Sequence, residues 1–298
     1  MTSGLTSMTV CSGIGAPTRP VLRWHGGKWR LAPWIISHFQ PHTCYVEPYG
    51  GGGSVLLRKD RSSLDVYNDL DRAVVTLFRL LRDDPDDLIR RVELTPFSRS
   101  DFDLAQNYAI EPNDDVDLCL RLLVRSHMGF SSAGACGRGG HQKTGFRGRG
   151  VRAGTTPPEN WRRFPPVLRQ VVERMQGVVI ERRPALDLIA AHDAADTLFY
   201  LDPPYLPEAR DAGADYTHEM SADDHAEMLD AVCRLQGMVV MSGYGSDMYD
   251  AALGQWRRFE KETRADGVRP RTEVLWMNFE PPGQPEQQAL NFSLRGVA

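Results

Sequence analysis

The stretch TCYVEPYGGGGSV, residues 43–55, decides the fold. Its first five residues have the apolar character of a short buried strand, and four consecutive glycines follow at positions 50–53. A strand that runs into glycines lets a ligand touch the backbone, because no side chains stand in the way. The pattern therefore predicts a ligand-binding loop at the carboxyl end of a strand.

Two common nucleotide-binding loops are excluded by the residues that follow the glycines. A P-loop needs Gly-Lys and then Ser or Thr, whereas Gly53 is followed by Ser54 and Val55. A G-x-G-x-x-G loop beginning at Gly50 would need a third glycine where Val55 stands. The ligand is therefore held by another kind of loop.

Outward from this stretch, strand patterns alternate with helix patterns, which is typical of an α/β sheet fold. We expect further strands at residues 64–67, 178–181, 197–201 and 238–242, helices at residues 70–81, at residues 167–176 and from Ser221, and a terminal antiparallel hairpin over residues 256–263 and 272–279. Residues 96–166 break the alternation, and residues 131–154 are crowded with glycine and arginine. We interpret residues 96–166 as an insertion between two halves of the sheet domain.

Charge is segregated along the chain, although its formal net charge is −4. Residues 1–46 contain no acid and four cationic side chains, and residues 118–158 contain no acid and seven. Such segregation allows an acidic protein to present a basic face to the phosphates of a nucleic acid. The candidates for phosphate contact or guanine reading are Arg121, Arg125, Arg138, Lys143, Arg147, Arg149 and Arg152. For any one of them the alternative is a solvated loop.

Two acidic motifs follow predicted strands. Asp69, in NDLD, lies about as far beyond the glycines as a ribose-binding acid does in doubly wound folds, with helix capping as the alternative. Asp202 begins DPPY directly after the strand at residues 198–201. Two prolines supply no N–H, so a carbonyl and a carboxylate face outward as an acceptor clamp suited to an exocyclic amino group.

Four motifs in order resemble the Dam-type (D12 class) DNA adenine-N6 methyltransferases, and phage-borne members in particular. They are WHGGK at 24–28, VEPYGGGGSV at 46–55, NDLD at 68–71 and FYLDPPY at 199–205. The match runs from about residue 21 to residue 279 and includes GVVIE, SGY and TEVLW further along. DPPY alone would leave the family open, whereas four motifs in order identify it.

The resemblance implies a Rossmann-like methyltransferase sheet that binds S-adenosylmethionine. The cofactor-binding residues would be Trp24, Lys28, Glu47, Tyr49, Gly51, Gly53, Asp69 and Asp187. Trp24 and Lys28 would border the methionine end, with Lys28 paired to its carboxylate. Asp69 would bind the ribose and Asp187 the adenine amino group, with Asp193, Asp196 or a capping role for Asp187 as alternatives.

The catalytic residues implied by the resemblance are Asp202, Pro203, Pro204 and Tyr205. Asp202 and the Pro203 carbonyl would accept both N–H bonds of the target amino group, and Tyr205 would stack on the base. Because that group is unreachable inside duplex DNA, the adenine should flip out of the helix. Methylation of cytosine N4 or of RNA adenine, and a catalytically silent DNA-binding regulator, remain the competing hypotheses.

The resulting organisation is a flexible arm (1–20), a catalytic domain (21–95 and 167–280), an inserted target-recognition region (96–166) and a tail (281–298). The hairpin with which Dam enzymes read GATC cannot be located in the insertion, so GATC specificity is not implied. No apolar run reaches the ~20 residues of a membrane span, and the five cysteines lack zinc or disulfide spacing. We expect a cytoplasmic protein without a metal, serving in restriction–modification or in phage evasion of host defence.

Overall fold

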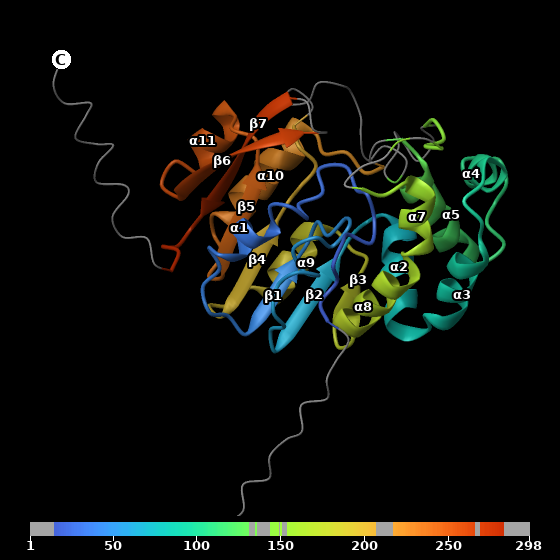
Figure 1. Ribbon diagram of the computed structural model, residues 1–298. Coiled ribbons are helices and arrows are strands. Elements are labelled where there is room, and N and C mark those ends of the chain that lie inside the picture. The colour runs from blue at the N-terminus through green and yellow to red at the C-terminus, as the bar shows by residue number, and fades with distance from the viewer. Residues whose placement is uncertain are drawn as a thin grey trace, which may run out of the picture.

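The computed structural model describes residues 15–130, 135, 144–148, 150, 154–206, 217–265 and 269–282. Its centre is a seven-stranded sheet in the order β3-β2-β1-β4-β5-β7-β6 (Figure 1). The strands are β1 Cys44–Glu47, β2 Leu64–Asn68, β3 Val179–Glu181, β4 Thr197–Leu201, β5 Met238–Gly243, β6 Arg257–Ala265 and β7 Arg269–Met277. β1 to β5 are parallel, whereas β7 is antiparallel to both β5 and β6. The predicted mostly parallel sheet with a terminal hairpin is confirmed.

Helices cover both faces of this sheet. They are α1 Ala32–Ile36, α2 Arg72–Asp83, α3 Asp86–Leu94, α4 Arg99–Ala105, α5 Asp115–Met128, α7 Pro157–Arg162, α8 Pro165–Met175, α9 Ala185–His192, α10 Ala222–Val232 and α11 Asp247–Ala252. Successive strand residues point to opposite faces. Tyr45 and Tyr67 therefore belong to a core with α2, α5 and α8, and Val46 and Val66 to a second core with α9, α10 and α11.

Helix α2 begins two residues later than the periodicity predicts. Asp71 is its N-cap, and the Asp71 carboxylate accepts a hydrogen bond from the Ala73 amide at 2.8 Å. Leu70 lies outside the helix and is 39% exposed, so it is not part of the apolar face. Because Asp71 caps the helix, Asp69 is not needed for that role.

The helices of the predicted insertion lie beyond the β3 edge, opposite the β6–β7 hairpin (Figure 1). Helix α5 packs against α2 of the sheet domain and against α3, α4 and α7. Directly after α5, Gly129 and Phe146 form an antiparallel bridge. The amide of Phe130 donates to the Gly145 carbonyl at 2.9 Å, and that of Arg147 donates to the Met128 carbonyl at 2.7 Å. The sequence did not indicate this pairing, because glycine and arginine carry little strand signal.

The last residues of the expected arm are anchored on the helices. The Thr18 amide donates to Oε1 of Gln170 at 3.2 Å, and Arg19 Nη2 donates to the Asn160 carbonyl at 2.7 Å. Arg23 then contacts Ser126 of α5, whose Oγ accepts from the Arg23 amide at 2.7 Å. This segment ties α5, α7 and α8 to the WHGGK motif, whereas residues 1–14 lie outside the described residues.

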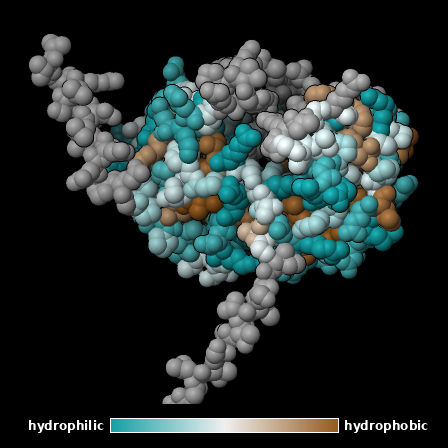
Figure 2. Space-filling view, viewed as in Figure 1, coloured by the Kyte–Doolittle hydropathy of each residue, from teal (hydrophilic) through white to brown (hydrophobic). Residues whose placement is uncertain are grey.

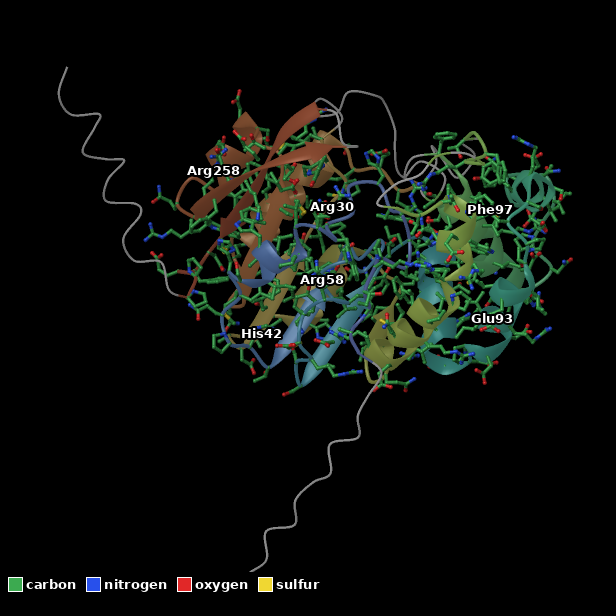
Figure 3. All side chains as sticks on the ribbon, in the orientation of Figure 1. Arg30, His42, Arg58, Glu93, Phe97 and Arg258 are labelled. Carbon is green, nitrogen blue, oxygen red and sulfur yellow. The ribbon has the colours of Figure 1, made fainter. Side chains whose placement is uncertain are left out.

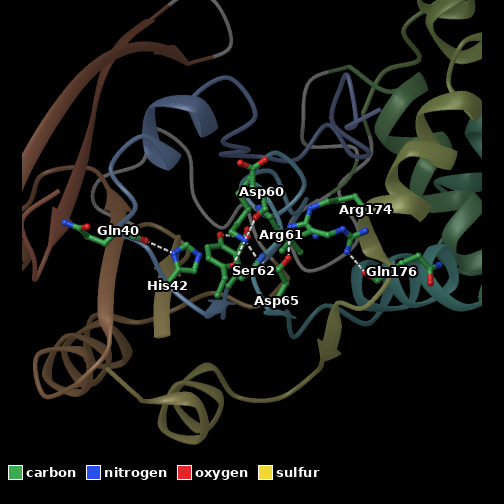
Figure 4. A network of polar contacts seen from close by, with 12 residues as sticks. Gln40, His42, Asp60, Arg61, Ser62, Asp65, Arg174 and Gln176 are labelled. Carbon is green, nitrogen blue, oxygen red and sulfur yellow. Dashed lines mark hydrogen bonds and ion pairs between the residues drawn. The ribbon is translucent and has the colours of Figure 1, made fainter. Parts of the chain in front are cut away.

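A buried ionic network holds α8 to the amino end of β2 (Figure 4). Asp65 accepts from Lys59 Nζ through Oδ1 and from Arg174 Nη2 through Oδ2, both at 2.8 Å. Lys59 also donates to Ser62, and Arg61 donates to the carbonyls of residues 173 and 176. We call Lys59, Asp65 and Arg174 the amino-end cluster.

The surface in Figure 2 is largely hydrophilic, with small apolar patches between polar side chains. Among the described residues, none of the helices has the length and apolar character needed to cross a membrane. The described part of the chain also contains no group of three acidic, histidine or cysteine side chains arranged to hold a metal. The cysteines within it, Cys44, Cys119 and Cys233, are free thiols.

Candidate active site

A cavity of about 510 Å³ opens at the carboxyl ends of the parallel strands. Carboxyl ends of parallel strands meet at one edge of a sheet, which is where open α/β sheets bind ligands. The predicted site residues that line the cavity are Trp24, Lys28, Glu47, Tyr49, Gly51, Asp69, Asp187, Asp202 and Pro204. The fold thus brings together residues from all four motifs.

The glycine loop is shaped by close packing beneath the cavity. Gly51 has φ +47°, and a Cβ there would come within 2.5 Å of Nε1 of Trp24. A Cβ at Gly50 would lie 2.2 Å from the ring of Tyr67. Gly53, at φ +62°, faces Phe78 of α2 instead and does not line the cavity. The positive φ of Gly53 contributes to the turn of the loop, and a cofactor contact at Gly53 stays a prediction.

The WHGGK loop is fixed against the glycine loop. Arg58, near the centre of Figure 3, donates to the Trp29 carbonyl at 2.7 Å, and its guanidinium lies 5.2 Å from the Trp29 ring centre. In the same loop, Trp24 forms one wall of the cavity and packs against Gly51.

Asp69 projects from the end of β2 into the cavity. Its Oδ2 accepts from the Gly51 amide at 2.7 Å, and its Oδ1 accepts from the Asp71 amide at 2.8 Å. Each oxygen retains a second lone pair for a ligand hydroxyl. Burial raises the pKa of Asp69 to about 6, so the carboxylate is charged at neutral pH.

Three acids compete for the role assigned to Asp187, and the structure separates them. Asp187 is exposed in the first turn of α9 and lines the cavity. Asp193 accepts from the amides of Gln236 and Gly237, and Asp196 accepts from the Thr43 hydroxyl. Only Asp187 of the three faces the cavity, which favours it as the ligand of the cofactor base.

Glu47 lies at the end of β1 and is 2% exposed. Its Oε2 accepts from the Tyr45 hydroxyl at 2.9 Å and from the Leu56 amide at 3.0 Å. Burial raises the pKa of Glu47 to about 8. At neutral pH the side chain therefore carries a proton for much of the time, and a bound cation would favour its charged form.

Asp202 stands at the corner after β4, where Pro203 is buried and Pro204 lines the cavity. Its Oδ1 accepts from Ser242 Oγ at 2.9 Å, and its Oδ2 accepts from Lys28 Nζ at 3.0 Å. The same ammonium lies 2.8 Å from Oδ1 as an ion pair. A carboxylate has about four acceptor positions. These contacts use three of them, which leaves Oδ2 with one position for an incoming N–H.

Lys28 was expected to pair with the cofactor carboxylate, and in this structure it contacts groups of the protein. Its buried Nζ contacts Asp202, the Gly26 carbonyl at 2.9 Å and the Tyr205 hydroxyl at 2.5 Å. Burial lowers the pKa of Lys28, but the charges of Asp202 and Glu273 outweigh it and raise the pKa above its usual value. Its three protons are therefore engaged by protein groups, and the expected carboxylate pairing would require one of these bonds to break.

Tyr205 is only 9% exposed and is absent from the cavity wall. Its ring packs on Tyr244, with centres 4.5 Å apart, and its hydroxyl donates to Oε1 of Glu273 at 2.7 Å. Stacking of the Tyr205 ring on a target base therefore stays a prediction. The hydroxyl joins Lys28 to Glu273.

Comparison with known proteins agrees with this site. Residues 24–246 match the family model of the D12 class N6 adenine-specific DNA methyltransferases. The chain belongs to this family. The DNA adenine methylase of Serratia marcescens is 32% identical over 72 residues, which cover 24% of this chain and 26% of that protein.

Two relatives align over more of the chain. The DNA adenine methylase of Salmonella typhi is 26% identical over 218 residues, covering 70% of this chain and 74% of that one. A type II methyltransferase of Lactococcus lactis subsp. cremoris is 22% identical over 289 residues, covering 88% and 95%. These relatives are bacterial and lend no support to a phage-like origin.

D12 methyltransferases use S-adenosylmethionine, and the residues of this site fit that cofactor. The charged Asp69 has free acceptor positions for ribose hydroxyls, Asp187 faces the same cavity, and Trp24 supplies an aromatic wall. Asp202 lies on the wall of the same cavity. A cofactor in the cavity can therefore contact the DPPY corner.

The predicted DNA-binding residues of this D12 methyltransferase are only partly described. Arg138, Lys143, Arg149 and Arg152 lie outside the described residues. Arg147 is half-buried beside the Gly129–Phe146 bridge. Arg125 is half-buried, donates to the Ala105 carbonyl at 3.0 Å and lies over the Tyr108 ring.

Arg121 is the one basic candidate that the structure removes. It is 8% exposed and bonded to Asp117 and to the carbonyl of Ile110. Because its guanidinium is already paired inside the helical region, it is not available to a phosphate. The spacing of four residues between Asp117 and Arg121 is a helical ion-pair signal that could have identified this.

Two site residues were missed by sequence reasoning. Ser242 is the second-last residue of β5, next to β4, and its hydroxyl donates a hydrogen bond to Asp202. Glu273 is a buried acid in β7, only 3.4 Å from Lys28 Nζ. Each lay in a segment that agreed with the family, but without a role. An acid directly before the apolar run from Val274 to Met277 was the available signal for Glu273, because a buried acid needs a partner.

Proposed function

We propose that this chain transfers a methyl group from S-adenosylmethionine to N6 of an adenine that has been flipped out of duplex DNA. The observation that carries the proposal is how Asp202 is paired and which acceptor position it leaves open. Its carboxylate is paired with Lys28 and Ser242 and retains one open acceptor position at the wall of the cavity. An acceptor fixed in this way suits an exocyclic amino group.

The N6 amine is a poor nucleophile because its lone pair is delocalised into the purine ring. Asp202 Oδ2 accepts one N–H, and the Pro203 carbonyl accepts the other, which favours a tetrahedral nitrogen with an available lone pair. S-adenosylmethionine, when bound, supplies an activated methyl group on its sulfonium. The protein contributes orientation and electrostatic stabilisation rather than a covalent intermediate.

We further propose that the insertion, residues 96–166, holds the DNA. Arg23 donates to the Gly129 carbonyl at 3.0 Å, so the two acid-free stretches of sequence meet in the fold. The antiparallel bridge between Gly129 and Phe146 places Arg147 next to the end of α5. Arg138, Lys143, Arg149 and Arg152 belong to the same acid-free stretch of the sequence. Arg125 would act from α5 at the edge of this surface.

The test is incubation with methyl-labelled S-adenosylmethionine and, separately, duplex DNA, single-stranded DNA and RNA, followed by mass spectrometry of the nucleosides. N6-methyladenine from duplex DNA is expected. N4-methylcytosine, or label in RNA alone, would establish one of the competing activities. DNA binding without any label in the nucleosides would instead indicate a silent regulator. If activity is found, restriction of the methylated DNA tests a role in restriction–modification.

A further inference from the structure

Glu273 is a buried acid for which the proposed chemistry has so far no use. Its side chain is 5% exposed, and the next four residues of β7, from Val274 to Met277, are buried and apolar. An acid in such a strand is costly to bury unless it is paired or hydrogen-bonded. Glu273 has such partners, and all of them belong to the DPPY corner and the WHGGK loop.

These partners form a continuous path to Asp202. Tyr205 donates to Glu273 at 2.7 Å, and Lys28 Nζ lies 3.4 Å from Glu273 and 2.8 Å from Asp202. The Tyr205 hydroxyl is also 2.5 Å from Lys28. We call Lys28, Asp202 and Glu273, with Tyr205, the carboxyl-end cluster.

One ammonium group is therefore shared between two carboxylates. With both acids ionised, the carboxyl-end cluster carries a net negative charge. Two further titratable groups face the cluster, Tyr244, whose ring packs on that of Tyr205, and Glu47, whose pKa the charge of Asp202 helps to raise. Neither adds a positive charge. Lys261, across the hairpin from Glu273, has its ammonium 5.3 Å from the Trp34 ring centre, and Arg271 lies over the ring of Tyr244.

We propose that Glu273 is a positioning residue for methyl transfer, which holds Lys28 and Tyr205 in place and keeps the charge of Asp202 from being fully neutralised. The inference rests on the proposed function. As the amine attacks, positive charge develops on N6, and a net negative cluster beside it lowers the energy of that state. A neutral Lys28–Asp202 pair would do so less well.

The arrangement predicts an acid limb in the rate. Burial raises the pKa of Glu273, and the charge of Lys28 opposes this rise without cancelling it. An acid with a raised pKa keeps its charge above that pKa and loses it as the pH falls. Methyl transfer should therefore slow on acidification, beginning at a higher pH than the titration of an ordinary carboxylate.

The experiment compares Glu273→Gln with Glu262→Gln, the same change at an exposed site on the neighbouring strand β6. Single-turnover methylation of duplex DNA is measured with both substrates saturating, from pH 5.5 to 9. Glu273→Gln should lower the rate constant about tenfold or more, and its decline at low pH should move to lower pH. The affinity for S-adenosylhomocysteine and the KM for DNA should stay within about twofold of the control. Tyr205→Phe should lower the rate but keep the acid limb.

Three results would overturn the inference. One is a Glu273→Gln rate within twofold of Glu262→Gln. Another is a lower rate with an unchanged pH profile, which would mark a structural role. The third needs no variant: a wild-type rate constant that is flat down to the range of ordinary carboxylates. A wild-type protein that methylates no adenine would instead reject the proposed function itself.

Discussion

Two buried ionic clusters lie at opposite edges of the sheet, one at the amino end of β2 and one after the carboxyl end of β4, and they differ in the balance of their charges. In the amino-end cluster, the cations Lys59 and Arg174 share a single acid, Asp65. In the carboxyl-end cluster, two acids share the single cation Lys28. Asp65 is 4% exposed, whereas Asp202 is 20% exposed and lines a cavity.

Burial alone does not decide the state of these groups. Burial lowers the pKa of Lys59, and its bond to Asp65 does not fully compensate. The pKa of Lys28 is raised, because two carboxylates outweigh the same desolvation. In the carboxyl-end cluster, Asp202 faces a cavity and has an unused acceptor position, which indicates a function. The amino-end cluster has no such group, and it holds α8 to β2.

The largest expected effect is at Asp202. Asp202→Ala should reduce methyl transfer by about a thousandfold or more, because the fixed acceptor for the amino group is removed. Asp202→Asn should be nearly as inactive, since one acceptor oxygen becomes a donor. Steady-state methylation of duplex DNA measures the loss, and calorimetry with S-adenosylhomocysteine should show that the affinity for that ligand is largely kept. Turnover like the wild type in either variant would contradict the assignment of the carboxyl-end cluster to catalysis.

The matching change in the amino-end cluster should affect stability instead. Asp65→Asn leaves Lys59 and Arg174 without their counter-charge, which should cost about 3–5 kcal/mol of unfolding free energy. The kcat of the folded variant should stay within twofold of the wild type. Urea unfolding and methylation assays at low temperature measure the two quantities, with exposed Asp60→Asn as the control. A large fall in kcat without loss of stability would contradict a purely structural role for the amino-end cluster.

The comparison also shows what sequence could predict and what it could not. Asp202 and Asp69 follow strands directly, so the rule that ligands bind at the carboxyl ends of strands was enough to place them in one site. The partner of Lys28 is 174 residues away in sequence, and no local pattern could reveal it. The resemblance assigned Lys28 to the cofactor carboxylate, and the pairing of Lys28 with Asp202 could be seen only in the fold.

Glu273 is a second case in which local sequence could not reveal a distant partner. Its importance depends on the antiparallel pairing of β7 with β5, which brings it to the DPPY corner. Local pattern can predict the hairpin but not which cluster its one buried acid will meet. Arg121 fails for a different reason, because its local pairing with Asp117 was readable and the net basic charge of the segment obscured it.

A smaller effect is expected at the far end of the cavity. Asp69→Ala should weaken S-adenosylhomocysteine binding by roughly 1–3 kcal/mol, the cost of leaving ligand hydroxyls without a charged partner. Calorimetry measures it directly, and Asp71→Ala is the control because Asp71 caps α2. Asp71 also lines the cavity, so weakening as large in Asp71→Ala as in Asp69→Ala would contradict the assignment of the ribose contact to Asp69 alone.

The smallest effect, spread over several residues, is expected in the insertion. Arg147, Arg149 and Arg152 would bind phosphates, so removing any one of these side chains should flatten the slope of log affinity against log salt by up to about one unit. Changing all three to alanine should raise the KM for DNA and leave that for the cofactor unchanged. If one arginine reads a guanine edge instead, its single substitution should relax the methylated sequence at one position. Sequencing the methylated sites of each variant separates these cases. A triple variant with wild-type affinity, salt slope and site choice would mean that the segment is a solvated loop and that DNA binds elsewhere.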